Sequence, residues 1–174
     1  MPVEIISPQL IEGVVDGLIA YLQANLPGQL AIVQAMYPAG AQDSPLPPPV
    51  SYFISERFVG LQTPAVFVLA EQSEHALDAM QNAALQNHRI QVVALIEVVG
   101  DEVADRLART CWRYARALWQ TLHDATLSAP YPTSTVLVEG IKYSPVLPVT
   151  SGAQRVFRKE AWLDVLAQSV EPFA

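Results

Sequence analysis

The sequence predicts an α/β (α+β) domain, in which a largely antiparallel or mixed sheet of four to five strands has two long helices packed on one face. Two observations carry this prediction. Apolar residues alternate along Arg89–Val99, as in a buried strand. From Asp101 to His123 no Gly or Pro interrupts the chain, and apolar residues recur at helical spacing. A buried strand that leads into an amphipathic helix forms one layer, around which the other elements have to pack.

The N-terminal region is predicted to be helical. Ser7 and Pro8 resemble an N-cap followed by Pro at the first helical position, and apolar residues then recur at helical spacing over Pro8–Asn25. Leu26-Pro27-Gly28 is expected to interrupt this helix. A second, short helix is then expected, with an apolar side formed by Leu30, Val33, Met36 and Tyr37.

A Pro-rich segment, Pro38–Pro49, separates the helical region from the first strands. Prolines lack backbone donors and favour extended structure, so we expect an exposed arm or loop within one domain. Val50–Ile54 and Ala65–Ala70 are predicted as short strands that flank a polar turn at Ser55–Gln62. Glu71–Asn87 is polar and rich in Ala and Gln, and it is predicted to be a long hairpin loop or a short helix.

The central strand and helix have well-defined faces. One face of the strand is fully apolar, with Ile90, Val92, Ala94, Ile96 and Val98, and the other is mostly so. Gly100 ends the strand, and Asp101 and Glu102 place negative charge where a helix begins. The predicted apolar stripe of the helix consists of Ala104, Leu107, Ala108, Cys111, Ala115, Leu118, Trp119 and Leu122.

The C-terminal part is predicted to complete the sheet. Ser128–Ser134 is expected to be a loop, Thr135–Tyr143 a strand, and Tyr143–Gly152 a second loop. Arg155–Ala167 is expected to be the closing strand. Its alternation places Phe157, Ala161, Leu163 and Val165 on one face and Arg158, Glu160 and Asp164 on the other.

Composition limits the class of protein. The 174 residues are most simply one domain (1–174), and 51% apolar with 16% charged residues is typical of a globular chain. No apolar run approaches the ~20 residues that span a bilayer, and we expect no signal peptide. The single cysteine fits a reducing, cytoplasmic setting. The net charge of −7 argues against extended binding to nucleic acid.

The sequence lacks the common motifs of catalytic sites, and we therefore predict that the protein is not an enzyme. The sequence contains no phosphate-binding loop, no GxSxG, no HExxH and no CxxC. His75, His88 and His123 lie far apart and lack further ligands at metal spacing, and His123 fits a helix C-terminus. Cys111 lies on the apolar stripe and is expected to be a small core residue. We therefore predict no catalytic, metal or cofactor site.

The main candidate for an interaction surface is a row of four arginines in the predicted helix. Arg106, Arg109, Arg113 and Arg116 follow one another at intervals of three and four residues, and they are four of the ten basic residues. One interpretation is a solvated face partly neutralised by nearby acids. The other is an interface to a neighbouring subunit or to nucleic acid, with the acidic N-terminal helix (Glu4, Glu12, Asp16) as a partner in trans and with Trp112 and Tyr114 beside the row.

The order of elements resembles a known family. An amphipathic helix is followed by PPPVSYFISER, a PAVFVLAEQ strand, HRIQVVALIEVVGDEVADRLARTCWRYARALWQTL, a TVLVEGIKYSP strand and GAQRVFRKEAWLDVLA. This succession is similar to that of the tail terminator (tail completion) proteins of long-tailed bacteriophages and prophages, over about Pro8 to Val170. The likeness lies in the order and character of the elements, since the family has no catalytic signature.

The resemblance implies a structural role in a virion. Such proteins form a ring, usually a hexamer, on the head-proximal end of the tail tube, where the ring ends tube polymerisation and provides the docking surface for the neck of the head. The implied partners are further copies of the chain, the tail tube protein and a head–neck connector protein, and genomic DNA passes through the lumen without specific binding. Two alternatives stay open: another neck connector or minor tail protein, and an unrelated cytoplasmic α/β protein that binds a small molecule.

Overall fold

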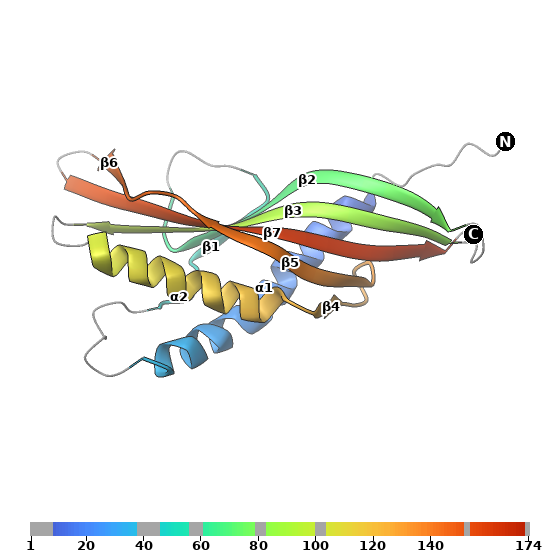
Figure 1. The fold of residues 1–174 in the computed structure, drawn as a ribbon, viewed down its shortest axis with the longest axis horizontal. Helices are drawn as coiled ribbons and strands as arrows, with labels where there is room; N and C mark the ends of the chain where they lie inside the picture. The colour runs from blue at the N-terminus through green and yellow to red at the C-terminus, as the bar shows by residue number, and fades with distance from the viewer. Residues whose placement is uncertain are drawn as a thin grey trace.

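A computed structural model describes residues 9–37, 46–55, 61–78, 83–99, 104–151 and 154–172. Over these residues it has an α+β fold with two helices and a curled, mixed sheet (Figure 1). No helix in the described part of the chain is long and apolar enough to cross a membrane. The elements in chain order are α1 (Gln9–Ala35), β1 (Ser51–Phe53), β2 (Ala65–Asp78), β3 (Ala83–Val99), α2 (Ala104–Leu122), β4 (Ala125–Leu127), β5 (Ser134–Tyr143), β6 (Leu147–Ser151) and β7 (Gln154–Pro172).

The sheet has the order β1-β2-β3-β7-β5-β4, and β6 pairs with β7 off this path. Its neighbouring strands are antiparallel, except that β1 runs parallel to β2. The predicted α+β class with a mixed sheet is therefore confirmed, but the described residues contain seven strands rather than four to five. The strands that the sequence did not indicate are β4, which is only three residues long, and β6, which lies within the predicted loop Tyr143–Gly152 and contains Pro148.

The β2–β3 hairpin is much longer than predicted. The described residues of Glu71–Asn87 are strand rather than a hairpin loop or a short helix, because β2 continues to Asp78 and β3 begins at Ala83. Residues 79–82 lie outside the described part. The strand character of this polar segment comes from pairing: β3 is hydrogen-bonded to β2 on one side and to β7 on the other. The predicted strands at Ala65–Ala70 and Arg89–Val99 are confirmed as parts of these longer strands.

Helix α1 continues through Pro27, contrary to the predicted break and second helix. Pro27 removes one backbone hydrogen bond, but the helix keeps burying residues on the same side beyond it. Leu26, Leu30 and Val33 are at most 1% exposed. Burial of this continuous apolar line stabilises the helix on both sides of the proline. The expected N-cap at Ser7 and Pro8 lies outside the described residues.

The main hydrophobic core joins the two helices to alternate residues of the sheet. In β3 the side chains of Val92, Ala94 and Ile96 belong to it, whereas Val93 and Leu95 belong to a second, smaller cluster. The two faces predicted for this strand are therefore both apolar and separately packed. From the helices the main cluster includes Val14, Leu18, Leu22, Leu26, Leu30 and Val33 of α1 and Leu107, Cys111, Tyr114, Leu118 and Leu122 of α2.

Two segments without regular structure pack against the helices. A Cβ at Gly13 or Gly17 of α1 would lie 3.0 Å from atoms of Pro132 or Tyr131, so glycines let this loop approach the helix closely. At the end of the Pro-rich segment, Leu46 is buried and the Pro47 carbonyl accepts a hydrogen bond from the Tyr114 hydroxyl. Residues 46–49 are thus anchored to α2 rather than forming a free arm, and residues 38–45 lie outside the described part.

A candidate interaction surface on helix α2

Helix α2 buries a broad apolar side and exposes a narrow one. The predicted stripe residues Leu107, Cys111 and Leu118 are fully buried. Two aromatic residues differ from the prediction. Trp119, expected on the buried stripe, is 40% exposed, whereas Tyr114, expected beside the arginine row, is fully buried. The buried side is therefore centred closer to Tyr114 than the sequence pattern indicated.

This shift divides the predicted arginine row. Arg106, Arg109 and Arg116 are exposed, but Arg113 is only 5% exposed, and its guanidinium lies 3.7 Å from the centroid of the Tyr37 ring. Successive helical residues are rotated by about 100°, so Arg113 lies roughly 60° around the helix from Arg116. That rotation turns Arg113 towards the end of α1, where it makes a cation–π contact between the two helices.

The exposed line of α2 contains a different set of residues. At about 100° per residue, six side chains fall within roughly 40° of one line along the helix. Trp112 is 52% exposed and Trp119 is 40% exposed, which is unusual for the largest apolar side chain. We call this line the α2 stripe, and its residues are Asp105, Arg109, Trp112, Arg116, Trp119 and His123.

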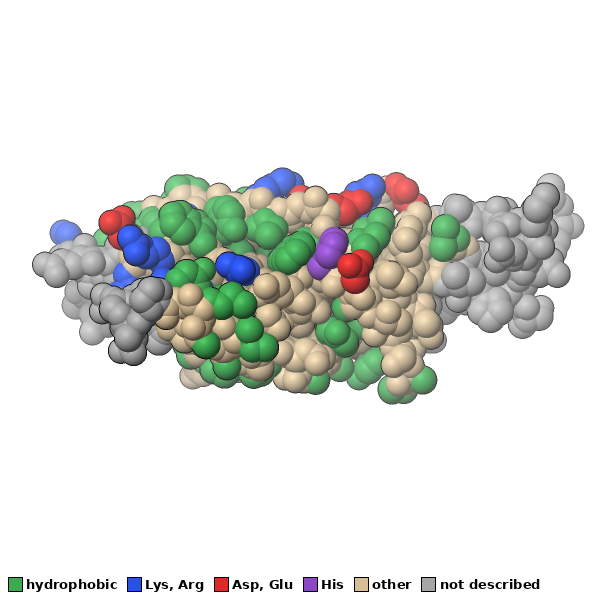
Figure 2. All heavy atoms as spheres, turned by 60° about the horizontal axis from the view of Figure 1, so that its bottom comes forward, with side chains coloured by type: hydrophobic (Ala, Val, Ile, Leu, Met, Phe, Trp, Pro, Cys, Tyr) green, Lys and Arg blue, Asp and Glu red, His purple; other side chains and the backbone are tan. Residues whose placement is uncertain are grey.

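Figure 2 shows the molecule turned so that the helices come forward, and on this face hydrophobic and basic side chains lie interleaved. Within the described residues no ion pair involves Arg109 or Arg116. Exposed tryptophan and arginine side by side are the residues most enriched at the energetically dominant positions of protein interfaces. Of the five residues predicted as an interface, the α2 stripe therefore keeps Arg109, Trp112 and Arg116.

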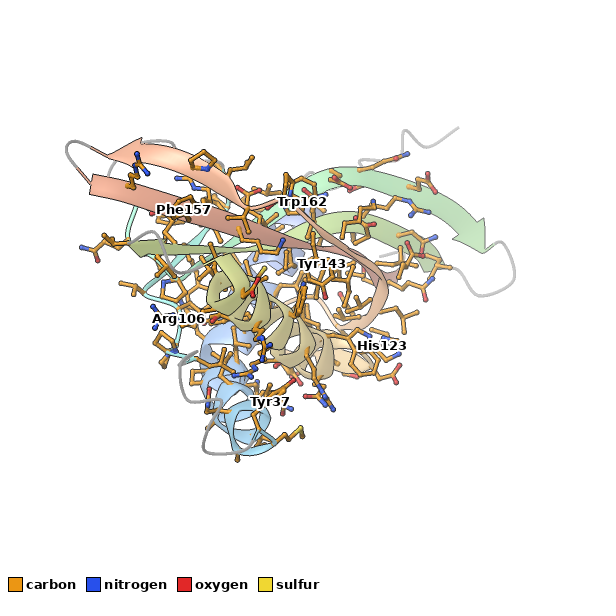
Figure 3. All side chains as sticks on the ribbon, turned by 60° about the vertical axis from the view of Figure 1, so that its left-hand side comes forward. Tyr37, Arg106, His123, Tyr143, Phe157 and Trp162 are labelled. Carbon is orange, nitrogen blue, oxygen red and sulfur yellow. The ribbon has the colours of Figure 1, made fainter. Side chains whose placement is uncertain are left out.

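The C-terminal end of the stripe is a small ordered cluster. The rings of Trp119 and His123 are stacked with centroids 5.1 Å apart, and the His123 Nδ1 accepts a hydrogen bond of 3.4 Å from the Val138 backbone N–H. Asp124, with a left-handed φ of 62°, ends the helix and lies 3.8 Å from His123. Figure 3 shows Arg106 and His123 towards opposite ends of α2.

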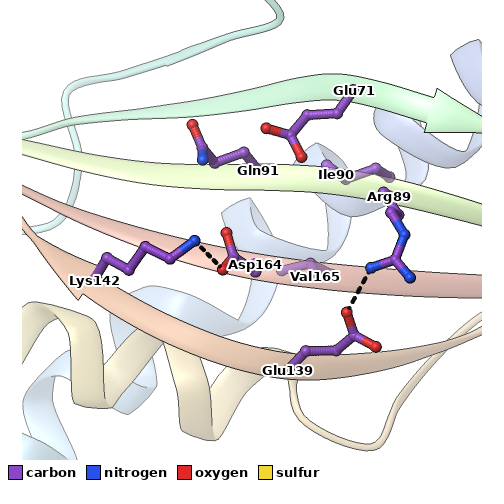
Figure 4. A pocket seen from close by; sticks show the side chains of 8 residues that line it. All are labelled: Glu71, Arg89, Ile90, Gln91, Glu139, Lys142, Asp164 and Val165. Atoms are coloured by element: carbon purple, nitrogen blue, oxygen red, sulfur yellow. Dashed lines mark hydrogen bonds and ion pairs between the residues drawn. The ribbon is translucent and has the colours of Figure 1, made fainter.

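The sheet carries a second polar feature, an open pocket of about 320 Å³ that crosses β2, β3, β7 and β5 (Figure 4). Its cations are paired: Arg89 lies 3.0 Å from Glu139, and Lys142 lies 2.7 Å from Asp164. The hydrogen bond to Asp164 and the charge of that carboxylate raise the pKa of Lys142. Matched, exposed ion pairs of this kind form a solvated sheet surface.

The candidate catalytic residues lie apart from one another. Cys111 is fully buried, and this burial raises the pKa of its thiol to about 12, so the reactive thiolate is suppressed at neutral pH. His88 is buried in β3, and its Nδ1 lies 2.8 Å from the Ser73 hydroxyl oxygen of β2. The side chain of His75 lies outside the described residues. No group of three or more potential metal ligands occurs in the described part of the chain.

Comparison with known proteins supports the fold. No family model and no curated protein matches the sequence. Among solved structures, the chain is similar to one from the virion of a native gene transfer agent (GTA) particle, with a TM-score of 0.56 and 13% sequence identity. The likeness covers 94% of this chain and 99% of the other. The two chains therefore share a fold over almost their whole lengths.

Proposed function

We propose that this protein is a structural, non-enzymatic component of a phage-like virion. The observation that carries the proposal is the shared fold with a chain of a gene transfer agent virion, which extends over 94% and 99% of the two chains. The likeness extends over nearly the whole of both chains rather than over a small common module, and this extent supports the proposal.

More specifically, we propose a tail terminator that forms a ring at the head-proximal end of the tail tube, with six copies as the resemblance to that family implies. Two features support this assignment. The exposed tryptophans and arginines of the α2 stripe suit contacts with other subunits of the particle. The net charge of −7 suits a channel through which DNA passes without being held. The partners would be the tube protein and a neck connector.

Electron microscopy of the purified protein, alone and mixed with its cognate tail tubes, tests this proposal. We expect rings, or tubes that carry added density at one end only. A ring seen elsewhere in the neck would favour a connector or a minor tail protein instead. Uniform small particles that leave the tubes unchanged would contradict a role in the tail and favour a soluble ligand-binding protein.

The same assay can test the stripe. The double variant Arg109→Glu, Arg116→Glu reverses the charge of the stripe. We expect it to reduce the fraction of capped tubes at least about tenfold, because two cations at the centre of the proposed contact are replaced by anions that repel the partner's acidic groups. The matched control is Arg89→Glu, which reverses an exposed charge on the sheet at 49% side-chain exposure. Equal capping by all three proteins would show that the α2 stripe takes no part in the particle.

A further inference from the structure

The α2 stripe has a symmetry that the proposed function does not use. Its residues, in chain order, are an acid, an arginine, a tryptophan, an arginine, a tryptophan and a histidine. When a second copy of the stripe runs antiparallel to the first, each residue lies opposite a chemically suitable partner. Asp105 meets His123, Arg109 meets Trp119, and Trp112 meets Arg116.

We propose that the α2 stripe binds the α2 stripe of a second copy of this chain, antiparallel and about a two-fold axis. The three pairings share one midpoint, at the level of Tyr114, so a single register satisfies all of them. Each pairing occurs twice across the axis. The contact therefore contains four arginine–tryptophan cation–π pairs, flanked at each end by an aspartate opposite a histidine.

The exposure of these side chains fits that arrangement. All six stripe residues are exposed or half-exposed, and Trp112 and Trp119 expose 52% and 40% of their surface. Antiparallel helices pack with axes about 8–10 Å apart, which brings side chains at facing positions into contact. An arginine that lies over an indole ring also covers apolar surface that water otherwise contacts, so the pairing is favourable beyond its charge.

Other occupants fit the stripe less well. A parallel pairing of two copies in the same register would place Arg109 on Arg109 and Arg116 on Arg116, which is repulsive. A nucleic acid would meet two arginines but also Asp105 and Asp124, in a protein with a net charge of −7. Extended phosphate binding requires a continuous basic face. The alternation of cation and indole therefore favours a second copy.

The pair is distinct from the proposed ring. A two-fold contact uses the same surface on both copies and is complete with two, whereas a ring repeats a contact between two different surfaces. The inference therefore does not depend on a role in a virion. It concerns the purified protein in solution, and it can be tested without tail tubes.

The test uses two complementary variants. The first combines Arg109→Ala with Trp112→Ala, and the second combines Arg116→Ala with Trp119→Ala. In either homodimer all four arginine–tryptophan pairs are lost, so we expect the dissociation constant to rise at least about tenfold. In a mixture of the two variants, the intact half of one stripe faces the intact half of the other, and two of the four pairs are restored. The mixture is therefore expected to dimerise more tightly than either variant alone.

Native mass spectrometry across the micromolar range measures all three species when one variant is uniformly labelled with heavy nitrogen, because the two variants have the same composition and would otherwise have the same mass. Circular dichroism checks that each variant is folded. The control combines Arg89→Ala with Tyr143→Ala, an exposed cation and a 43% exposed aromatic residue that do not belong to the stripe, and it should dimerise like the wild type.

Two results would overturn the proposal. One is a wild-type protein that stays monomeric throughout the micromolar range. The other is a mixture that dimerises no better than its components, which would exclude the antiparallel register. In the first case, loss of binding to a single-stranded oligonucleotide in both variants would identify nucleic acid as the occupant instead.

Discussion

Arg109 and Arg113 are four residues apart on α2 and yet have opposite environments. Arg109 is exposed, whereas Arg113 is 5% exposed and lies over the Tyr37 ring. We expect Arg113→Ala to lower the free energy of unfolding by about 1–3 kcal/mol, because it removes a desolvated cation–π contact and leaves a gap between the helices. Arg109→Ala should change it by at most about 0.5 kcal/mol.

Urea denaturation of the two variants measures this difference. Arg113→Lys separates charge from shape, because lysine keeps the cation but loses the flat guanidinium that lies over the ring. Equal destabilisation by Arg109→Ala and Arg113→Ala would show that the Tyr37 contact contributes nothing to stability.

The buried thiol of Cys111 makes the free energy of unfolding depend on pH in the alkaline range. Its pKa is raised from 9.0 to about 12 by burial, so the unfolded chain releases this proton first. Between these two values the folded state binds more protons than the unfolded state, and the free energy of unfolding therefore falls as the pH rises. Burial also raises the pKa of Tyr52 to about 12, which adds to the same trend.

Cys111→Ser isolates the contribution of the thiol, because a serine hydroxyl does not titrate in this range. Between pH 9.5 and 11, the free energy of unfolding should fall less steeply in the variant than in the wild type, by up to about 1.4 kcal/mol per pH unit. Urea denaturation at a series of pH values gives both slopes. Parallel slopes would mean that the thiol is solvated in the folded protein.

At the residue scale the sequence grouped residues of α2 that the structure separates into a buried and an exposed set. The spacing of the arginines alone placed Arg113 with Arg109 and Arg116, and the apolar spacing placed Trp119 in the core. Periodicity defines a helical face only to within some tens of degrees, and the exact phase is set by what packs against it. Here that contact is the end of α1, at Tyr37, which lies far away in the sequence.

At the scale of elements, segments with strong apolar periodicity were predicted correctly, whereas a polar segment without periodicity was not. β3 and α2 were predicted because burial imposes a period on their apolar residues. Glu71–Asn87 shows no such period. Its residues 71–78 belong to β2, which pairs with β3, and its residues 83–87 pair with both β2 and β7, which lies some eighty residues further along the chain. The predicted helix break at Pro27 was wrong for a related reason, because burial of α1 against distant parts of the chain outweighs the local helix-breaking preference of proline.

Two glycines of α1 provide a matched test of how that helix packs. A Cβ at Gly17 would lie 3.0 Å from the Tyr131 Cβ, whereas a Cβ at Gly28 has no atom within 4 Å. We expect Gly28→Ala to raise the free energy of unfolding by about 0.5–1 kcal/mol, through helix propensity alone. Gly17→Ala has the same helical gain but forces the loop away, so it should be at least about 1 kcal/mol less stable than Gly28→Ala.

Thermal or urea unfolding of both variants checks the pair. A gain in Gly17→Ala as large as that in Gly28→Ala would show that the loop around Tyr131 yields without cost. The comparison is internal to one helix, so differences in the unfolded chain largely cancel.

At the scale of the whole molecule, one exposed surface has two proposed occupants. In solution the α2 stripe faces a second copy, and in a particle it faces a neighbouring subunit. Both cannot bind at once, so the two-fold pair would compete with assembly by mass action. Substitutions that weaken the pair without damaging the particle contact would then speed capping of tubes.

The arrangement of the sheet was the least predictable part. The sequence indicated a mixed or antiparallel sheet, but the order β1-β2-β3-β7-β5-β4 depends on contacts between distant segments. Periodicity shows which face of a strand is buried and says nothing about its neighbours. The succession of elements indicated the general role that is proposed here, whereas the surface that carries the proposed contacts could be defined only from the structure.

The position of the tryptophans on the α2 stripe gives the protein an optical reporter of its own. Trp112 and Trp119 are two of only three tryptophans in the chain. Indole emission moves to shorter wavelength when water is excluded from the ring, so any occupant of the stripe should change the intrinsic fluorescence of the unlabelled protein. A cuvette titration can therefore follow whatever covers this helix.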